Sequence, residues 1–168
     1  MRHMRLAKRE ITDKARICEI VETCQVLRIG VVDDEGMFIV PVNYGYTWDE
    51  DAALPRFYIH SAREGRKADA FRSQGDAGMP VALELDQDRG TIAGSYSCAY
   101  SRSYASIMAA GRVREVADED ERQHALKLIM AHAAPEAPTS FTPEGVARVA
   151  IFRIDVDHLT AKERQMKV

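Results

Sequence analysis

One junction limits what this chain can fold into more than any other stretch, namely Phe57–Lys67, with the sequence FYIHSAREGRK. Its first half has strand composition, and after a polar turn Ala68 and Phe71 recur at helical spacing. Arg66 and Lys67 therefore fall in the first turn of a helix, where the helix dipole mildly disfavours cations. Two cations beside free backbone N–H groups predict a bound anion such as a phosphate. A solvated basic helix face is the alternative that this stretch leaves open.

Length, charge and cysteine content narrow the class of protein. At 168 residues and 46% hydrophobic content, we expect one domain over residues 1–168, with residues 1–10 flexible. The net charge of −3 argues against nucleic-acid binding. Cys18, Cys24 and Cys98 are odd in number and lack a CxxC spacing, so they favour neither a disulfide framework nor a zinc site. Without an apolar signal segment or membrane-spanning run, a cytoplasmic protein is expected.

The first half of the chain predicts a helix followed by a hairpin and a further strand. The helix begins after Thr12, which is a suitable cap, and carries one apolar stripe. The hairpin joins Val26–Asp33 to Met37–Tyr46, with Gly36 available for positive φ in the turn. The strand Arg56–Ser61 then leads into the junction described above.

The second half predicts three strands and another long helix. We expect a short strand at Val81–Leu85, a loop at Gly90–Cys98, a long strand at Tyr100–Val116 bent at Gly111, and a last strand at Val146–Val156. A helix with a capping-box pattern separates the last two strands. Mainly antiparallel strands with peripheral helices predict an α+β domain built on a closed or split β-barrel.

Six segments follow, in order, the pattern of one known family. They are Arg9–Asp13, Pro41–Tyr46, the junction, TyrAlaSerIle at 104–107 followed by Gly111, Leu126–His132 and Leu159–Glu163. In these segments the chain resembles the flavin-binding split β-barrels, the superfamily of pyridoxamine 5′-phosphate oxidase. It is most similar to the nitroimidazole-resistance branch, in which a strand ending in His-Ser enters a Glu-Gly-x-Lys turn. The resemblance implies a split barrel that binds flavin mononucleotide (FMN).

The resemblance also implies where the flavin ring lies. It places backbone atoms of Pro41, Val42, Asn43 and Tyr44 at the edge of the ring, and it places Ser106 facing the ring. A bulged edge strand without a ligand is the alternative at the proline, since proline cannot donate to a β-ladder. For Ser106, the alternative is a serine on a half-buried strand that hydrogen-bonds to the backbone.

The chemistry of the junction suits the phosphate end of FMN. Arg66 can bind a phosphate dianion bidentately, Lys67 adds a point charge, and Ser61 can donate a hydrogen bond to a phosphate oxygen. His60 can lie beside the ring or the ribityl chain, or be a strand-end histidine with local partners. His60 and Tyr104 are the candidate catalytic residues, as proton donors to a reduced substrate.

The resemblance therefore implies an FMN-dependent oxidoreductase, with nitro compounds such as 5-nitroimidazoles as acceptors. The expected partners are a small-molecule electron acceptor, NAD(P)H as donor, and a second copy of the chain; neither nucleic acid, a membrane nor a bound metal is expected. A flavin- or haem-binding module without turnover is the alternative, because one fold hosts many functions. The C-terminal Ala161–Val168 lacks the Arg-rich tail that would favour a pyridoxamine phosphate substrate.

Overall fold

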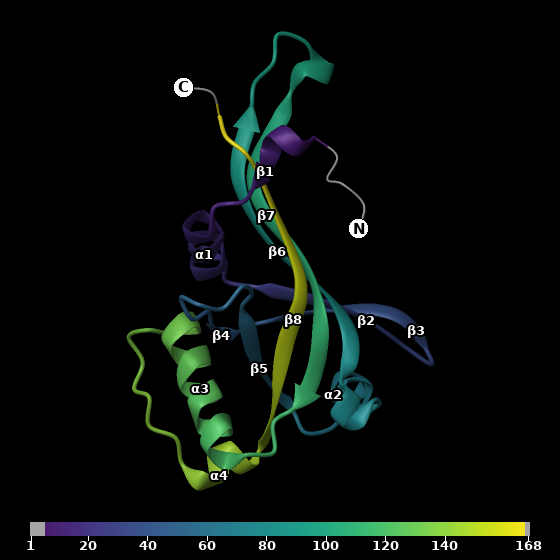
Figure 1. The fold of residues 1–168 in the computed structure, drawn as a ribbon, viewed down its shortest axis with the longest axis vertical. Coiled ribbons are helices and arrows are strands. Elements are labelled where there is room, and N and C mark those ends of the chain that lie inside the picture. The colour runs from purple at the N-terminus through teal and green to yellow at the C-terminus, as the bar shows by residue number, and fades with distance from the viewer. Residues whose placement is uncertain (1–5, 167–168) are drawn as a thin grey trace.

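The computed structural model describes residues 6–166, which build one antiparallel sheet with helices on its outside (Figure 1). The strands of this part of the chain run in the order β3-β2-β6-β7-β8-β5-β4, and β1 pairs with β8. The strands are β1 (Glu10–Ile11), β2 (Leu27–Asp33), β3 (Gly36–Val42), β4 (Gly45–Thr47), β5 (Arg56–Ala62), β6 (Met79–Ile92), β7 (Ser101–Glu115) and β8 (Val149–Arg164). The predicted α+β class with mainly antiparallel strands is confirmed.

Short and long helices connect the strands. The α-helices are α1 (Lys14–Thr23), α2 (Arg66–Arg72), α3 (Glu119–Ala133) and α4 (Pro143–Ala147), and the 3-10 helices are η1 (Ala7–Arg9), η2 (Gly75–Ala77) and η3 (Ser97–Ala99). The expected helix after the junction is therefore present as α2. Beyond the body, β6 and β7 continue as a two-stranded arm with η3 at its tip (Figure 1).

The strand expected at Val81–Leu85 is wrong in extent, because β6 continues to Ile92. Its later residues are polar and are held by side chains of neighbouring strands: Arg28 donates to the carboxylate of Asp86, and Arg102 donates to that of Asp88. Cross-strand polar pairs stabilise a sheet without producing an apolar alternation. The apolar alternation therefore predicted an end of this strand that lies too early in the chain. For the same reason, the first residues of Gly90–Cys98 were predicted as a loop although they belong to β6.

The last strand begins later and ends later than Val146–Val156. Val146 belongs to α4, whose first turn is fixed by Pro143 and by the Thr142 hydroxyl, which accepts from the N–H of Gly145 at 3.1 Å. The strand β8 then runs to Arg164 because it pairs along its length with β7. The apolar residues of α4 were mistaken for the start of the strand.

Two glycine positions were predicted correctly. The β2–β3 turn holds Gly36 at φ 111°, and the register of β7 against β8 shifts between Ala110 and Gly111.

The predicted cap of α1 was wrong. The side chain of Asp13, not that of Thr12, accepts a hydrogen bond from a backbone N–H, that of Ala15, at 3.3 Å.

The interior consists of two clusters of buried side chains. The larger cluster fills the inside of the curved sheet and includes fully buried Phe57, Ile59, Phe71, Leu85, Ile107 and Phe152. The smaller cluster lies where α3 and α4 cover β5 and β8, and includes Tyr58, Val116, Ala125, Ile129 and Ile151. Strand β5 contributes to both, because neighbouring side chains of a strand point to opposite faces.

The N-terminal segment lies against the last strand. Glu10 pairs with Lys162 and Ile11 with Ala161. Of the ten residues expected to be flexible, residues 1–5 lie outside the described residues, and residues 7–10 form η1 and the first residue of β1. Within residues 6–166, no helix combines the length and the hydrophobicity needed to cross a membrane.

Candidate functional site

A pocket of about 330 Å³ lies where the strand-to-helix junction meets the end of β3. Six residues line it: Val26, Pro41, Val42, Asn43, His60 and Lys67. All except the first were predicted from sequence as cofactor-binding residues. The fold thus brings together two segments that lie about twenty residues apart in the chain.

The two sides of the pocket are built by strand ends. Within residues 6–166, strand β3 lies at the edge of the sheet and pairs with β2 alone, so Pro41 occupies a position where a missing N–H is tolerated. Both sequence interpretations of this proline are therefore compatible with the structure, since the same edge position also lines the pocket. On the other side, β5 ends at Ala62 and α2 begins at Arg66 after Gly65, which has φ 108°.

Lys67 is the cation of the pocket. Its side chain is half-buried, and within residues 6–166 its ammonium group forms no hydrogen bond or ion pair. Burial lowers the pKa of Lys67 below its usual value, because the charged form has lost part of its water. A partly desolvated ammonium without a counter-ion is unfavourable. An anionic ligand in the pocket would remove that cost.

His60 lies close enough to Lys67 to feel its charge. Burial first, and then the positive charge of Lys67, lower the pKa of His60 below its ordinary value of 6.5. This shift favours the neutral imidazole, which offers one N–H donor and one acceptor to a ligand. A neutral ring is a weaker proton donor than an imidazolium. The lowered pKa therefore makes His60 less suited to the predicted role of proton donor.

Arg66 is engaged elsewhere. Its Nε and Nη2 donate to the two carboxylate oxygens of Asp33 at 2.7 and 2.8 Å, and its guanidinium lies 4.2 Å from the ring centre of Phe38. These contacts tie α2 to the β2–β3 hairpin. The bidentate fork that the sequence assigned to a phosphate is thus occupied by a carboxylate, and Arg66 does not line the pocket.

Two further predicted residues are buried beside the pocket. Ser61 follows His60 on β5 and faces the interior, with 5% of its surface exposed. Tyr44 is fully buried; its hydroxyl lies 2.9 Å from the carbonyl oxygen of Cys24 and also contacts that of Val21. The Tyr44 side chain therefore secures the end of α1, and only its backbone is available for the role that the resemblance implied.

Tyr104 and Ser106 lie on the outer face of β7. Their neighbours Ala105 and Ile107 are fully buried in the interior. Ser106 stands opposite Asp86 and Lys162 on the adjacent strands. Neither Tyr104 nor Ser106 lines the pocket of its own chain.

Sequence reasoning missed two residues near the site. Val26 lines the pocket, and an apolar residue at a strand start gives no signal of that role. His132 lies beside Tyr44: the centres of the two rings are 4.3 Å apart, and the Nε2 of His132 lies 3.1 Å from the carbonyl oxygen of Glu22. Its place at the end of the apolar stripe of α3 was the available signal. Among residues 6–166, no cluster of three or more His, Cys, Asp or Glu side chains could hold a metal ion.

Comparison with solved structures places this geometry in a known class. A protein of Bacteroides thetaiotaomicron, provisionally assigned as a 5-nitroimidazole antibiotic resistance protein, is 29% identical with a TM-score of 0.74, covering 91% of this chain and 85% of that chain. An FAD- and haem-binding protein of Mycobacterium smegmatis is 17% identical with a TM-score of 0.74, covering 95% and 76%. A flavocytochrome of Azotobacter vinelandii is 16% identical with a TM-score of 0.76, covering 97% and 72%.

These neighbours and the sheet order define the fold as a split β-barrel of the kind that binds flavins, as predicted. The sequence itself matches the family described as pyridoxamine 5′-phosphate oxidase over residues 13–163. The chain belongs to this family, which includes oxidoreductases and flavin-binding proteins. No curated protein matches the sequence significantly. Family membership makes a flavin the cofactor class to test against the pocket.

Proposed function

We propose that this chain is an FMN-binding oxidoreductase that passes electrons to a small nitro compound. The observation that carries the proposal is Lys67, a half-buried cation without a counter-ion among the described residues, in a pocket shared with His60 and the end of β3. FMN ends in a phosphate dianion, which supplies the missing negative charge. The likeness to the provisionally assigned nitroimidazole-resistance protein supports the choice of acceptor.

Each pocket residue has a definite part in this proposal. Lys67 holds the phosphate as a point charge, and the backbone of Pro41, Val42 and Asn43 offers polar groups to the ring edge. Neutral His60 hydrogen-bonds the bound cofactor without adding positive charge. Bound FMN supplies the two-electron redox chemistry, with NAD(P)H as the proposed donor. The protein contributes binding, orientation and control of access.

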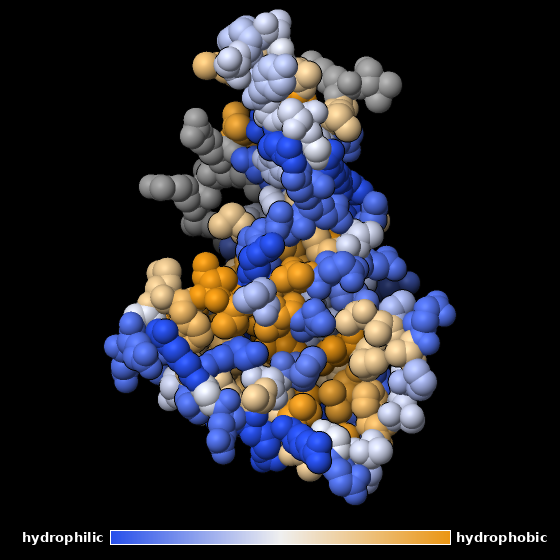
Figure 2. Space-filling view, turned by 180° about the vertical axis from the view of Figure 1, so that it is seen from behind, coloured by the Kyte–Doolittle hydropathy of each residue, from blue (hydrophilic) through white to orange (hydrophobic). Residues whose placement is uncertain are grey.

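A second copy of the chain completes the site in this proposal. Tyr104 and Ser106 are on the outer face of β7, away from the pocket of their own chain, so they can meet a flavin only across an interface. The same sheet face carries an apolar patch, formed by Val32, Met37, Ile39, Ala82, Met108 and Ala110. Figure 2 shows hydrophobic side chains gathered on the body of the molecule below the mainly hydrophilic arm. Such a patch favours burial against another protein surface.

The FMN part of the proposal is tested by titrating the flavin-free protein with FMN. Lys67→Met should weaken binding tenfold or more, since a charge-assisted bond contributes about 1.5–3 kcal/mol. Lys127→Met, at an exposed lysine of α3, is the matched control and should bind FMN as the natural chain does. Equal dissociation constants for the two variants would remove Lys67 from the phosphate site.

The catalytic part needs a separate measurement. The flavin-loaded protein is reduced anaerobically with dithionite, and its reoxidation by a 5-nitroimidazole is followed by stopped-flow absorbance at about the flavin maximum. Acceptor-dependent reoxidation supports the oxidoreductase. A rate no higher with the nitroimidazole than without it contradicts nitro reduction.

The second candidate function is a flavin- or haem-binding module without turnover. It is favoured by the fold shared with the FAD- and haem-binding protein and with the flavocytochrome. The visible spectrum of the purified protein separates the cases, because flavin and haem absorb at different wavelengths. A haem band, or a flavin band without any acceptor-dependent reoxidation, favours the module.

A further inference from the structure

A second and larger pocket, of about 1130 Å³, shares no lining residue with the first. It lies between the end of α2, the end of β7, the start of α3 and α4. Its volume lies just above the range of about 300–1,000 Å³ that is common for ligand pockets, so it has room for a small organic molecule. The proposed function makes no use of this pocket.

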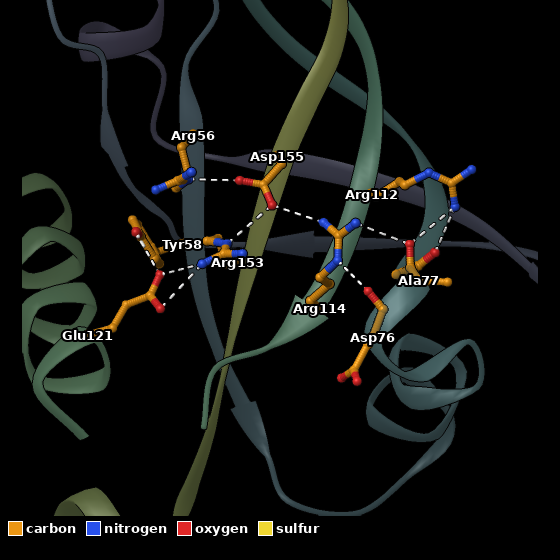
Figure 3. Close-up of polar contacts among 10 residues, drawn as sticks. Arg56, Tyr58, Asp76, Ala77, Arg112, Arg114, Glu121, Arg153 and Asp155 are labelled. Atoms are coloured by element: carbon orange, nitrogen blue, oxygen red, sulfur yellow. Dashed lines mark hydrogen bonds and ion pairs between the residues drawn. The ribbon is translucent and has the colours of Figure 1, made fainter. Parts of the chain in front are cut away.

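Five arginines line the larger pocket, and three of them have committed partners. Arg72 donates to both carboxylate oxygens of Glu115, at 2.6 and 2.8 Å. Arg114 and Arg153 belong to an ion-pair network centred on Asp155, which Figure 3 shows together with Arg56 on the neighbouring strand. Arg153 also pairs with Glu121 at 3.0 Å. These three guanidiniums therefore form part of the wall.

Arg63 and Arg122 are the remaining two, and both bind mainly backbone oxygens. Arg63 donates to the carbonyl of Ala147 at 2.8 Å. Arg122 donates to the carbonyls of Val146 and Val149 at 3.0 and 3.2 Å. These carbonyls position the two guanidiniums without neutralising them, and each guanidinium keeps further N–H donors.

The carboxylates around these two arginines do not balance them. Arg122 has only a 3.4 Å contact with Glu119, whose side chain is 61% exposed and therefore well screened by water. Glu115 accepts hydrogen bonds from Arg72 and lies near the charges of Arg63 and Arg122. Together the three arginines lower the pKa of Glu115. Asp76 lines the pocket too, but it is exposed. The fourth carboxylate of the lining, Glu121, is committed to Arg153, so five guanidiniums and four carboxylates line the pocket and one positive charge is in excess.

The pocket also has an apolar wall. It includes Phe71 and Val116, which are buried, together with Phe141 and Val146 from the α3–α4 loop and α4. A ligand that uses both walls must carry an anionic group on an apolar body. Arginine binds carboxylates and phosphates alike, through paired N–H donors.

We propose that the larger pocket binds a small organic acid, a carboxylate or phosphate monoester on an aromatic or aliphatic body, with Arg63 and Arg122 holding the anion and Phe141 contacting the body. Two probes separate the headgroups, benzoate and phenyl phosphate. Inorganic phosphate reports on the headgroup without an apolar body.

Isothermal titration of the purified protein, with and without saturating FMN, tests the proposal. At least one organic probe should bind, more tightly than inorganic phosphate and equally with FMN present. Arg63→Gln should weaken it tenfold or more, and Arg63→Lys less. The control Arg102→Gln, at an exposed arginine of the arm, should leave binding unchanged. Phe141→Ala should weaken the organic probes but not inorganic phosphate.

Several results overturn the proposal. These are the absence of binding by either organic probe, competition between the probe and FMN, equal weakening by Arg63→Gln and Arg102→Gln, or inorganic phosphate binding as tightly as phenyl phosphate. Arg63 is the preferred test position because it lies in an exposed turn, whereas Arg122 also holds α4 in place. Circular dichroism of each variant checks that the fold is retained.

Discussion

Replacing Gly111 by alanine should destabilise the protein through one steric conflict. A Cβ atom there would lie 2.3 Å from the carbonyl oxygen of Asp155 and 3.1 Å from the Cα of Val156, both in the backbone of β8. Nonbonded atoms pack best at about 3.5–4 Å, so the strands must separate locally by about 1 Å. Strand β8 cannot move alone, because Asp155 also pairs with Arg56 of β5.

A second glycine offers a matched control. At Gly30, on β2 of the same sheet, an added Cβ would have Ala82 Cβ as its nearest neighbour, at an ordinary 3.7 Å. Replacing glycine in a strand by alanine gains about 0.5–1 kcal/mol in either variant from backbone entropy. The difference between Gly111→Ala and Gly30→Ala therefore isolates the overpacking cost, which is about 1–3 kcal/mol.

Urea unfolding followed by circular dichroism measures this difference. With a slope of about 2 kcal/mol per M, the midpoint of Gly111→Ala should lie about 0.5–1.5 M below that of Gly30→Ala. Both variants should unfold with the same slope. Midpoints that coincide within about 0.2 M would refute the steric reasoning.

Three further predictions concern single groups. Tyr44→Phe should lower the free energy of unfolding by about 1 kcal/mol and leave FMN affinity unchanged, because the buried hydroxyl bonds the end of α1; urea unfolding and FMN titration check this. Iodoacetamide at pH 8 should label exposed Cys98 well before buried Cys24, whose thiol pKa burial raises to about 11, as mass spectrometry can follow. FMN affinity should begin to fall as pH rises past the Lys67 pKa, which lies below 10.5 in the free protein, because only the ammonium form attracts the phosphate. Titrations from pH 7 to 11 should show this fall in the natural chain and not in Lys67→Met.

The lowered pKa of Lys67 makes the stability of the flavin-free protein change with pH in the opposite direction to FMN affinity. Folding disfavours the ammonium form of Lys67, so its cost is present below the folded pKa. The contribution of this group to stability rises as pH increases through the folded pKa towards 10.5. The charge of Lys67, which is proposed to hold the ligand, therefore destabilises the flavin-free protein.

The sequence predicted the elements whose side chains alternate between apolar and polar. The bend at Gly111 and the hairpin at Gly36 were predicted because only glycine suits a close approach or a positive φ. The sequence pattern did not predict the second half of β6 or the end of β8, where polar side chains contact each other across strands. Such pairing depends on residues as distant as Arg28 and Asp86, and a local pattern carries no sign of them.

The site was predicted as a set of segments but not as an arrangement of side chains. The junction and the end of β3 do meet in one pocket, and Lys67 is the cation there. Arg66, its neighbour in sequence, turns to Asp33 because the β2–β3 hairpin lies beside the start of α2. Tertiary contacts decide which of two adjacent cations lines the pocket, and they also decide the outward direction of Tyr104.

The position of β8 within the sheet has a consequence for how the protein is made. This strand comes last in sequence, yet it lies between β7 and β5 and joins the two halves of the sheet. A ribosome that has released residues up to about 145 has delivered β5 and its neighbour β4, but not β8, which pairs with the other edge of β5. Non-local pairing of this kind closes slowly, and unpaired strand edges invite aggregation. The nascent chain must therefore keep β5 exposed until its last strand emerges, and we expect folding to follow synthesis of β8 rather than to proceed along with it.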